Sequence, residues 1–296
     1  MHQANGMLHA TDEVSLALET ARRLLANEPK LLPGHVWLVG AGPSDPSQLT
    51  LQALAALTQA DSVVHDALVD ARVLELLSPT AERIFVGKRG GRPSISQAEI
   101  CERMISLARA GRRVIRLKGG DPYVFARGGE EVLALAQAGI PFRVIAGLTS
   151  GLAALTAASI PATVRGVNQS LVLITGHESN VGAAGAPNWA LLAKLAEPLV
   201  IYMALRNISV ICDALMAGGM RPDIPVAVIA AAGTIAERVI VATLTSITQG
   251  VEQANVSAPA ILVVGEIVAH RAALQEAVAV AETQRRSAIM ESSAVE

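Results

Sequence analysis

Short apolar runs that end at glycine or threonine alternate along this chain with helical segments. The runs at residues 36–39, 171–174 and 261–264 hold only hydrophobic side chains. Strands that helices cover on both faces have such continuous apolar runs, and they are typical of parallel sheets. The sequence therefore predicts an α/β fold in which these runs are buried parallel strands.

The first half of the chain shows this alternation most clearly. Asp45 precedes Pro46 at one expected helix start, and Ser96 with Glu99 forms a capping box at another. Alternating strands and helices favour parallel strands with crossover connections. The strands are expected at about 36–39, 62–65, 83–86, 113–117 and 142–145, and the helices at 45–59, 96–111 and 129–138.

A second α/β set follows a helix expected at 149–159. Its strands are predicted at 171–175, 199–202, 226–230, 239–242 and 261–264, with helices at 189–196, 209–217 and 246–253. The sequence thus indicates an N-terminal α/β domain at 34–147 and a C-terminal α/β domain at 148–275. An N-terminal extension, 1–33, is expected to hold a helix at 11–27, and the polar end, 276–296, is expected to be a flexible tail.

Composition argues against several functional classes. The formal net charge is −2 and aromatic residues make up 2% of the chain, so no nucleic-acid surface is expected. No apolar run reaches the roughly 18 residues of a membrane span, and the N-terminus does not resemble a signal peptide. Cys101 and Cys212 are isolated, which favours a reducing cytoplasm and indicates neither a metal site nor a disulfide.

A glycine-rich turn, Gly-Ala-Gly-Pro-Ser-Asp-Pro at residues 40–46, follows the first expected strand. It resembles a dinucleotide fingerprint, in which a helix N-terminus holds pyrophosphate. However, Asp45 stands where the third glycine is needed, and Pro43 removes a backbone N–H. The turn therefore favours a ligand without phosphates, and a purely structural turn stays open.

A second such turn, Arg-Leu-Lys-Gly-Gly-Asp-Pro at residues 116–122, ends a later strand. Its glycines allow close backbone approach to a ligand, and Asp121 can accept hydrogen bonds from an amine or a ribose hydroxyl. Ligands of open α/β sheets lie at the carboxyl ends of strands. Arg127 and Glu130 follow at a helix start, where Arg127 is predicted to be unpaired and suited to a carboxylate. A structural turn is again the alternative.

Taken in order, the motifs of the chain resemble the uroporphyrinogen-III C-methyltransferases, a branch of the tetrapyrrole methylase superfamily. The resemblance covers about residues 34 to 271, and the block from 116 to 131 is specific to this branch. The motifs are Gly-Ala-Gly-Pro at 40–43, Val-Gly-Lys-Arg-Gly-Gly at 86–91, the turn at 116–122, Arg-Gly-Gly-Glu-Glu at 127–131, Gly-Leu-Thr-Ser-Gly at 147–151, Thr-Gly-His at 175–177 and Tyr-Met at 202–203.

The resemblance implies a two-domain tetrapyrrole methylase fold of class III methyltransferases, in a cytoplasmic homodimer without metal. It implies S-adenosyl-L-methionine as methyl donor, in the cleft between domains. The acceptor would be uroporphyrinogen III, converted to precorrin-2 by methylation at C2 and C7, and the pathway that uses the product stays open. The implied donor contacts are Pro43, Gly119, Gly120, Asp121, Val124, Thr149, Ser150, Met203 and Gly233.

The resemblance also implies catalytic roles for Asp66, Lys88 and Arg127. Asp66 can take a proton or orient a water, and Lys88 can donate a proton or neutralise a carboxylate. Arg127 keeps its proton, so an electrostatic role on the substrate is expected. Implied substrate contacts are Arg89, Arg127, Glu130 and Arg165. Because the acceptor carries many carboxylates, a basic cleft is predicted from Lys88, Arg89, Arg92, Arg116, Lys118, Arg127 and Arg165.

Other interpretations stay open. A relative within the superfamily would methylate a precorrin. A non-catalytic Rossmann-type module would bind NAD and ignore S-adenosylhomocysteine, and a scaffold would keep the fold without turnover. For Asp66 and Lys88 themselves, the alternative to a catalytic role is a surface ion pair without function.

Overall fold

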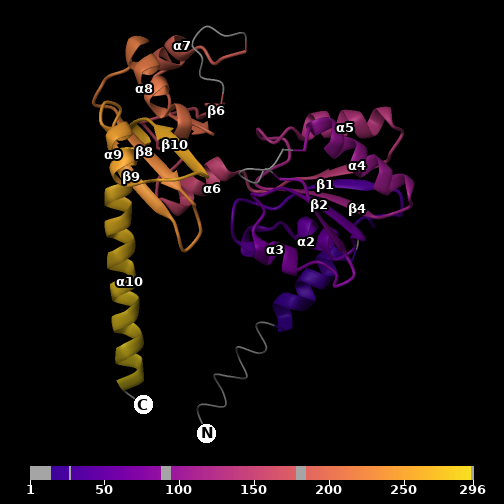
Figure 1. Cartoon of the computed structure of the whole chain (residues 1–296). Helices are drawn as coiled ribbons and strands as arrows, with labels where there is room; N and C mark the ends of the chain where they lie inside the picture. Colours follow the sequence, from indigo (N-terminus) through magenta and orange to yellow (C-terminus); the bar gives the residue numbers. More distant parts are fainter. Residues whose placement is uncertain (1–14, 27, 88–94, 178–184, 295–296) are drawn as a thin grey trace. The chain divides into compact units, whose positions relative to one another are not determined.

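The computed structural model describes residues 15–294 except 27, 88–94 and 178–184. The chain divides into two compact units, Met1–Thr149 and Ser150–Glu296, and each unit has its own sheet (Figure 1). Ahead of the first sheet, residues 15–25 form a helix inside the predicted N-terminal extension.

The first unit holds a parallel sheet with the strand order β3-β2-β4-β1-β5. β1 lies between β4 and β5, so the loops that follow these three strands meet at one edge of the sheet. The strands are β1 (Val36–Gly40), β2 (Ser62–His65), β3 (Glu82–Phe85), β4 (Val114–Lys118) and β5 (Phe142–Ile145).

Helices cover both faces of this sheet (Figure 1). Because side chains alternate along a strand, Val36 and Leu38 pack toward α4 (Gln97–Arg109) and α5 (Gly128–Gln137). Trp37 and Val39 pack toward α2 (Leu51–Leu57) and α3 (Ala71–Glu75). The two-sided burial explains why β1 is apolar without interruption.

Helix starts follow their predicted caps, with one difference. The capping box of α4 is present, since the side chains of Ser96 and Glu99 each accept from the other's backbone N–H. The single helix predicted at 45–59 is instead the 3-10 turn η1 (Pro46–Gln48), capped by Asp45, followed by α2. A new helix, α2, begins after Thr50. Thr50 is its N-cap, because the hydroxyl of Thr50 accepts a hydrogen bond from the N–H of Ala53.

The second unit has a mixed sheet of order β6-β7-β10-β8-β9. Its middle strand β10 is buried, as predicted, but runs antiparallel to both β7 and β8, so the prediction of a parallel strand at 261–264 is wrong. A continuous apolar run predicts that a strand is buried on both faces, but it does not predict whether the strand runs parallel or antiparallel to its neighbours. The strands are β6 (Val172–Thr175), β7 (Leu199–Tyr202), β8 (Pro225–Ala230), β9 (Arg238–Thr243) and β10 (Ala260–Val264).

Helices also cover both faces of the second sheet. α7 (Trp189–Lys194), α8 (Ile208–Ala217) and α9 (Ile247–Gln253) share one core with the strands. α6 (Ser150–Ala157) lies on the opposite face, where the N–H of Gly151 donates to the Tyr202 hydroxyl at 3.0 Å.

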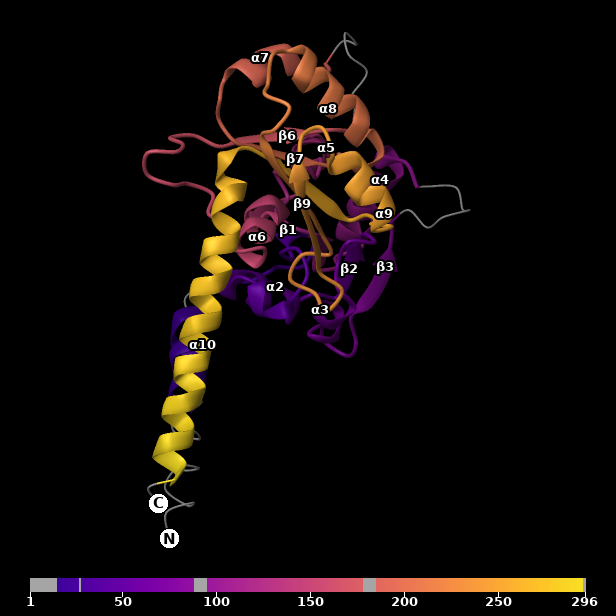
Figure 2. The ribbon, with the colours of Figure 1, turned by 90° about the vertical axis from the view of Figure 1, so that its left-hand side faces the viewer.

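The short 3-10 turns η2 (Leu205–Asn207) and η3 (Glu266–Ala269) precede α8 and the final helix α10 (His270–Ala294). α10 continues through residues that the sequence assigns to a flexible tail (Figure 2). Alanine, the strongest helix former, is the commonest residue there, and neither glycine nor proline interrupts the segment. Among the described residues, no helix combines the length and apolarity that a membrane span requires.

Candidate active site

Three loops of the first unit meet where β1, β4 and β5 end. Gly42 and Gly120 pair across two of them, with N···O distances of 3.2 and 2.8 Å. Asp121 joins the third loop, because its Oδ2 accepts from the N–H of Gly147 at 3.0 Å. The motif turns that the sequence singles out are therefore parts of one arrangement at the strand tips.

Glycines let these three backbones pack together. A Cβ on Gly147 would lie 2.2 Å from the carbonyl oxygen of Gly120, and a Cβ on Gly40 would lie 2.6 Å from the Cα of Gly147. Gly120 also has a positive φ of 70°. The glycines are thus required by the packing of the loops, whatever ligand the loops also hold.

Asp121 fastens the loop after β4 to the loop after β5. Its Oδ1 accepts from the N–H of Tyr123 at 2.8 Å, while its Oδ2 holds Gly147. Each carboxylate oxygen has two lone pairs, so each can accept one more hydrogen bond from a ligand. Asp121 is half-buried and can therefore shape the loops and bind a donor group at the same time.

Pro43 lies in the loop after β1 and Val124 in the loop after β4, and both residues are half-buried. Thr149 lies after β5 at the end of the first unit. These three residues and the glycines at 119 and 120 are thus all on the loops that Asp121 and the glycine pairs lock together.

The second unit carries the other predicted donor contacts. Ser150 begins α6, and Met203 follows β7 with a φ of 56° and an exposed side chain. Gly233 lies in the loop after β8, where its N–H donates to Glu237 at 2.7 Å. Arg165 is exposed in the connection between α6 and β6. The predicted cations Lys88, Arg89 and Arg92 lie outside the described residues.

A buried ion network lies under the ends of β2 and β4. Arg116 and Lys118 point toward α4 and α5, and each is 3% exposed. Glu131 of α5 accepts from Arg116 Nε at 3.1 Å and from Lys118 Nζ at 3.0 Å through the same oxygen, Oε1. Arg116 Nη2 also lies 3.6 Å from Asp66 Oδ2. The prediction that Arg116 and Lys118 line a basic cleft is therefore wrong, because both are paired in the interior.

The sequence analysis did not predict that Glu131 and Gln97 belong to this network. The Nε2 of Gln97 donates to Glu131 Oε1 at 2.9 Å. Two cations on a buried central strand require a buried anion, and that requirement is the signal that would have found Glu131. Burial lowers the pKa of Lys118, repulsion by Arg116 lowers it further, and Glu131 opposes both effects. Burial likewise lowers the pKa of His65, at the end of β2.

Arg127 lies just ahead of α5 with a positive φ of 60°. It forms a two-point pair with Glu130, with distances of 2.8 Å from Nε and 2.7 Å from Nη2, so the prediction of an unpaired Arg127 is wrong. The hydrogen bond from Arg127 lowers the pKa of Glu130, and the same bond raises the pKa of Arg127. Both side chains are more than half exposed and present fixed charges to the surroundings.

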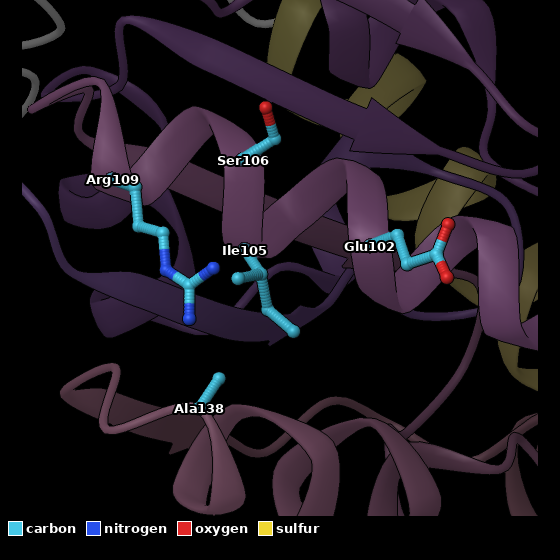
Figure 3. A pocket seen from close by; sticks show the side chains of 5 residues that line it. All are labelled: Glu102, Ile105, Ser106, Arg109 and Ala138. Carbon is cyan, nitrogen blue, oxygen red and sulfur yellow. The ribbon is translucent and has the colours of Figure 1, made fainter.

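A groove between α4 and the end of α5 lies beside the ion network and not at the strand tips. Figure 3 shows Ile105 and Arg109 of α4 pointing toward Ala138, which follows α5. Among the described residues that line the groove, none belongs to the strand-tip loops. The chemistry of the candidate site therefore resides in the loops and in the ion network beneath them.

Two adjacent glycines give a matched test of how tightly the 116–131 block is packed. A Cβ on Gly128 would lie 2.2 Å from the carbonyl oxygen of Pro122, whereas a Cβ on Gly129 would meet nothing within 4 Å. We expect Gly128→Ala to lower the free energy of unfolding by about 3 kcal/mol or more. Gly129→Ala is expected to leave it unchanged or raise it by up to about 1 kcal/mol, because alanine favours helix. Urea denaturation measures both, and equal stability of the two variants would contradict the packing.

Comparison with known proteins shows the family of this chain. Residues 35–248 match the tetrapyrrole (corrin/porphyrin) methylases. The chain is 49% identical over 251 residues to a uroporphyrinogen-III C-methyltransferase of Sinorhizobium sp, which covers 85% of this chain and 90% of that protein. It is 43% identical to a siroheme synthase of Acinetobacter baylyi over 82% of this chain but 52% of that protein, so it spans about half of that relative's length.

A solved structure is also similar to this chain. The uroporphyrin-III C-methyl transferase of Thermus thermophilus, complexed with S-adenyl homocysteine, matches with a TM-score of 0.68 at 39% identity. The match covers 79% of this chain and 98% of the other.

Proposed function

Because the chain belongs to the tetrapyrrole methylase family, we propose that it is a uroporphyrinogen-III C-methyltransferase. It transfers methyl groups from S-adenosyl-L-methionine to C2 and C7 of uroporphyrinogen III and gives precorrin-2. The observation that carries the proposal is the set of glycine loops locked by Asp121 at the strand tips. They stand in a chain that covers 90% of a relative named for this activity.

The strand tips suit a donor without phosphates. The place where a dinucleotide would put its pyrophosphate holds Asp45, whose Oδ1 accepts from the N–H of Ser47 at 2.8 Å. A carboxylate at that helix start repels a phosphate and already uses the N–H group that would bind one. Asp45 thus disfavours a Rossmann-type nucleotide-binding module.

When bound, S-adenosyl-L-methionine supplies a methyl group that its sulfonium charge already activates. Asp121 offers free lone pairs for an amine or a hydroxyl of the donor, and the loop glycines let backbone groups approach it. Holding the reacting atoms in line can supply up to about 7–11 kcal/mol. The proposed donor contacts are those that the family motifs mark: Pro43, Gly119, Gly120, Asp121, Val124, Thr149, Ser150, Met203 and Gly233.

Arg127 is the proposed anchor for the polyacidic acceptor. Its two-point pair with Glu130 has the geometry that an acceptor carboxylate would also adopt, so a substrate carboxylate can replace Glu130 on the guanidinium. Asp66, partly exposed at the end of β2, is proposed to take a proton or to orient a water. Lys88 is proposed as its acid–base counterpart, with Arg89, Glu130 and Arg165 as further acceptor contacts.

Mass spectrometry of the product tests the function. Incubation with uroporphyrinogen III and S-adenosyl-L-methionine is expected to give a product with the mass of two added methyl groups, as methylation at C2 and C7 requires. A matched incubation with precorrins separates this activity from that of other members of the family. Methylation of a precorrin alone would transfer the assignment to another branch, and no methylation of any acceptor would support a scaffold.

We also propose a cytoplasmic homodimer. Cys101 and Cys212 are buried and unpaired, which suits a reducing compartment. Burial raises the pKa of Cys212 to about 11, so this thiol stays protonated and unreactive at neutral pH.

Light scattering is expected to give twice the mass of one chain, and the mass of a single chain would contradict the dimer.

A further inference from the structure

The guanidinium of Arg116 is fixed on several sides. Its Nε donates to Glu131 Oε1 at 3.1 Å, and its Nη1 lies 3.3 and 3.2 Å from the carbonyl oxygens of Val64 and Leu117. Because a guanidinium is rigid and planar, these contacts also fix the position of Nη2. That nitrogen lies 3.6 Å from Asp66 Oδ2.

Asp66 is held between this guanidinium and a backbone group. Its Oδ1 accepts from the N–H of Leu68 at 3.0 Å, and its Oδ2 faces Arg116. The Asp66 side chain is 26% exposed, whereas that of Arg116 is 4% exposed. A partly exposed carboxylate therefore rests against a positive charge whose place is set from the interior.

The burial of Glu131 is expected to cost free energy of folding, so stability alone does not explain its presence. It is fully buried, and its Oε1 accepts from Gln97, Arg116 and Lys118 together. Its Oε2 has no hydrogen-bond partner among the described residues. A buried oxygen without a partner costs free energy, and apolar replacements of buried ion pairs are often neutral or stabilising.

We therefore propose that Glu131 is a positioning residue: by fixing Arg116, it fixes the Asp66 carboxylate for proton handling. The inference rests on the proposed function, because Asp66 matters only if this reaction occurs. It assigns a role to a side chain that is fully buried and is not among the proposed donor or acceptor contacts. The role is to set the rate of turnover without changing the affinity for either ligand.

Two double variants separate positioning from charge balance. Lys118→Met/Glu131→Gln and Lys118→Met/Glu131→Met each remove one positive and one negative charge from the interior, so Arg116 and Asp66 still balance. The replacements are close in length to the original side chains. Only glutamine at 131 keeps an oxygen that can accept from Arg116 Nε. The pair therefore differs in the one contact that the inference requires.

The glutamine variant is expected to keep kcat within about threefold of Lys118→Met alone. The methionine variant is expected to lose on the order of 10- to 100-fold in kcat, as misplacement of a reacting group does. The KM for uroporphyrinogen III and the Kd for S-adenosylhomocysteine should change less than about twofold in both. Equal kcat in the two folded variants, or a loss confined to KM, would overturn the inference.

Arg116→Lys provides a second test should the methionine variant not fold. It keeps the charge, but one ammonium cannot hold the planar contacts with Glu131 and the carbonyls while it faces Asp66. We expect the same loss of kcat as for the methionine variant, and turnover equal to that of the unaltered protein would contradict the role of Glu131.

Crystal structures separate this inference from the proposed function. Inactivity of the unaltered protein toward uroporphyrinogen III would refute the function alone. The structures would then still decide the positioning role: Asp66 should keep its place in the glutamine variant and move in the methionine variant. An Asp66 carboxylate in the same place in both structures would refute positioning by Glu131.

Discussion

Asp121→Ala is expected to weaken the binding of S-adenosylhomocysteine by about 100-fold. The change removes the acceptor that fastens Gly147 and Tyr123, and it removes the lone pairs proposed to bind the donor. A hydrogen bond to a charged group contributes about 1.5–3 kcal/mol, and tenfold in affinity corresponds to about 1.4 kcal/mol. Isothermal titration calorimetry with S-adenosylhomocysteine measures the effect directly.

Asp70→Ala is the matched control for this variant. Asp70 also accepts from a backbone N–H two residues ahead, that of Arg72 at 2.8 Å, but it caps α3 and has no predicted contact with the donor. Its loss should leave the affinity for S-adenosylhomocysteine within about threefold. Asp121→Asn should fall between, because an amide oxygen can hold only one of the two N–H groups well. If Asp121→Ala bound S-adenosylhomocysteine with unchanged affinity, the proposal that the strand-tip loops form the donor site would be wrong.

The order of elements could be predicted because their signals are local. β2, β5 and β7 begin and end where the sequence predicts, since each is a run of four residues that contains two β-branched side chains. The direction of β10 could not be predicted, because it depends on which strands become its neighbours. α3 was not predicted either, because five residues are too few to show helical periodicity.

In the candidate site, too, one part could be predicted from the sequence and another could not. The loops around Gly42, Asp121 and Gly147 could be placed together, because parallel strands bring their carboxyl ends to one edge. The partners of Arg116 and Lys118 could not be predicted by motif, since the same residues fit a surface cleft and a buried pair. Only the position of β4 between β1 and β2 shows that these cations must be buried.

Arg127→Ala is expected to lower kcat for uroporphyrinogen III methylation by at least about 100-fold. Loss of one preorganised charged donor at a reacting substrate commonly costs about 100- to 1,000-fold. The variant should bind S-adenosylhomocysteine within about twofold of the unaltered protein, because Arg127 pairs with Glu130 and not with the Asp121 loop contacts. Single-turnover kinetics and calorimetry measure the two effects separately.

Arg127→Lys tests whether charge or shape is needed. Lysine keeps the positive charge but cannot form the two-point contact, so partial activity would assign the remaining loss to the guanidinium fork. The backbone cost is the same in both variants, because residue 127 already has a φ of 60°. If Arg127→Ala weakened S-adenosylhomocysteine as much as Asp121→Ala does, the separation of donor and acceptor roles would be wrong. Of these two residues, only Asp121 is expected to affect the affinity for the donor, whereas turnover is expected to depend on both, because Asp121 holds the loop after β5 and Arg127 pairs with Glu130.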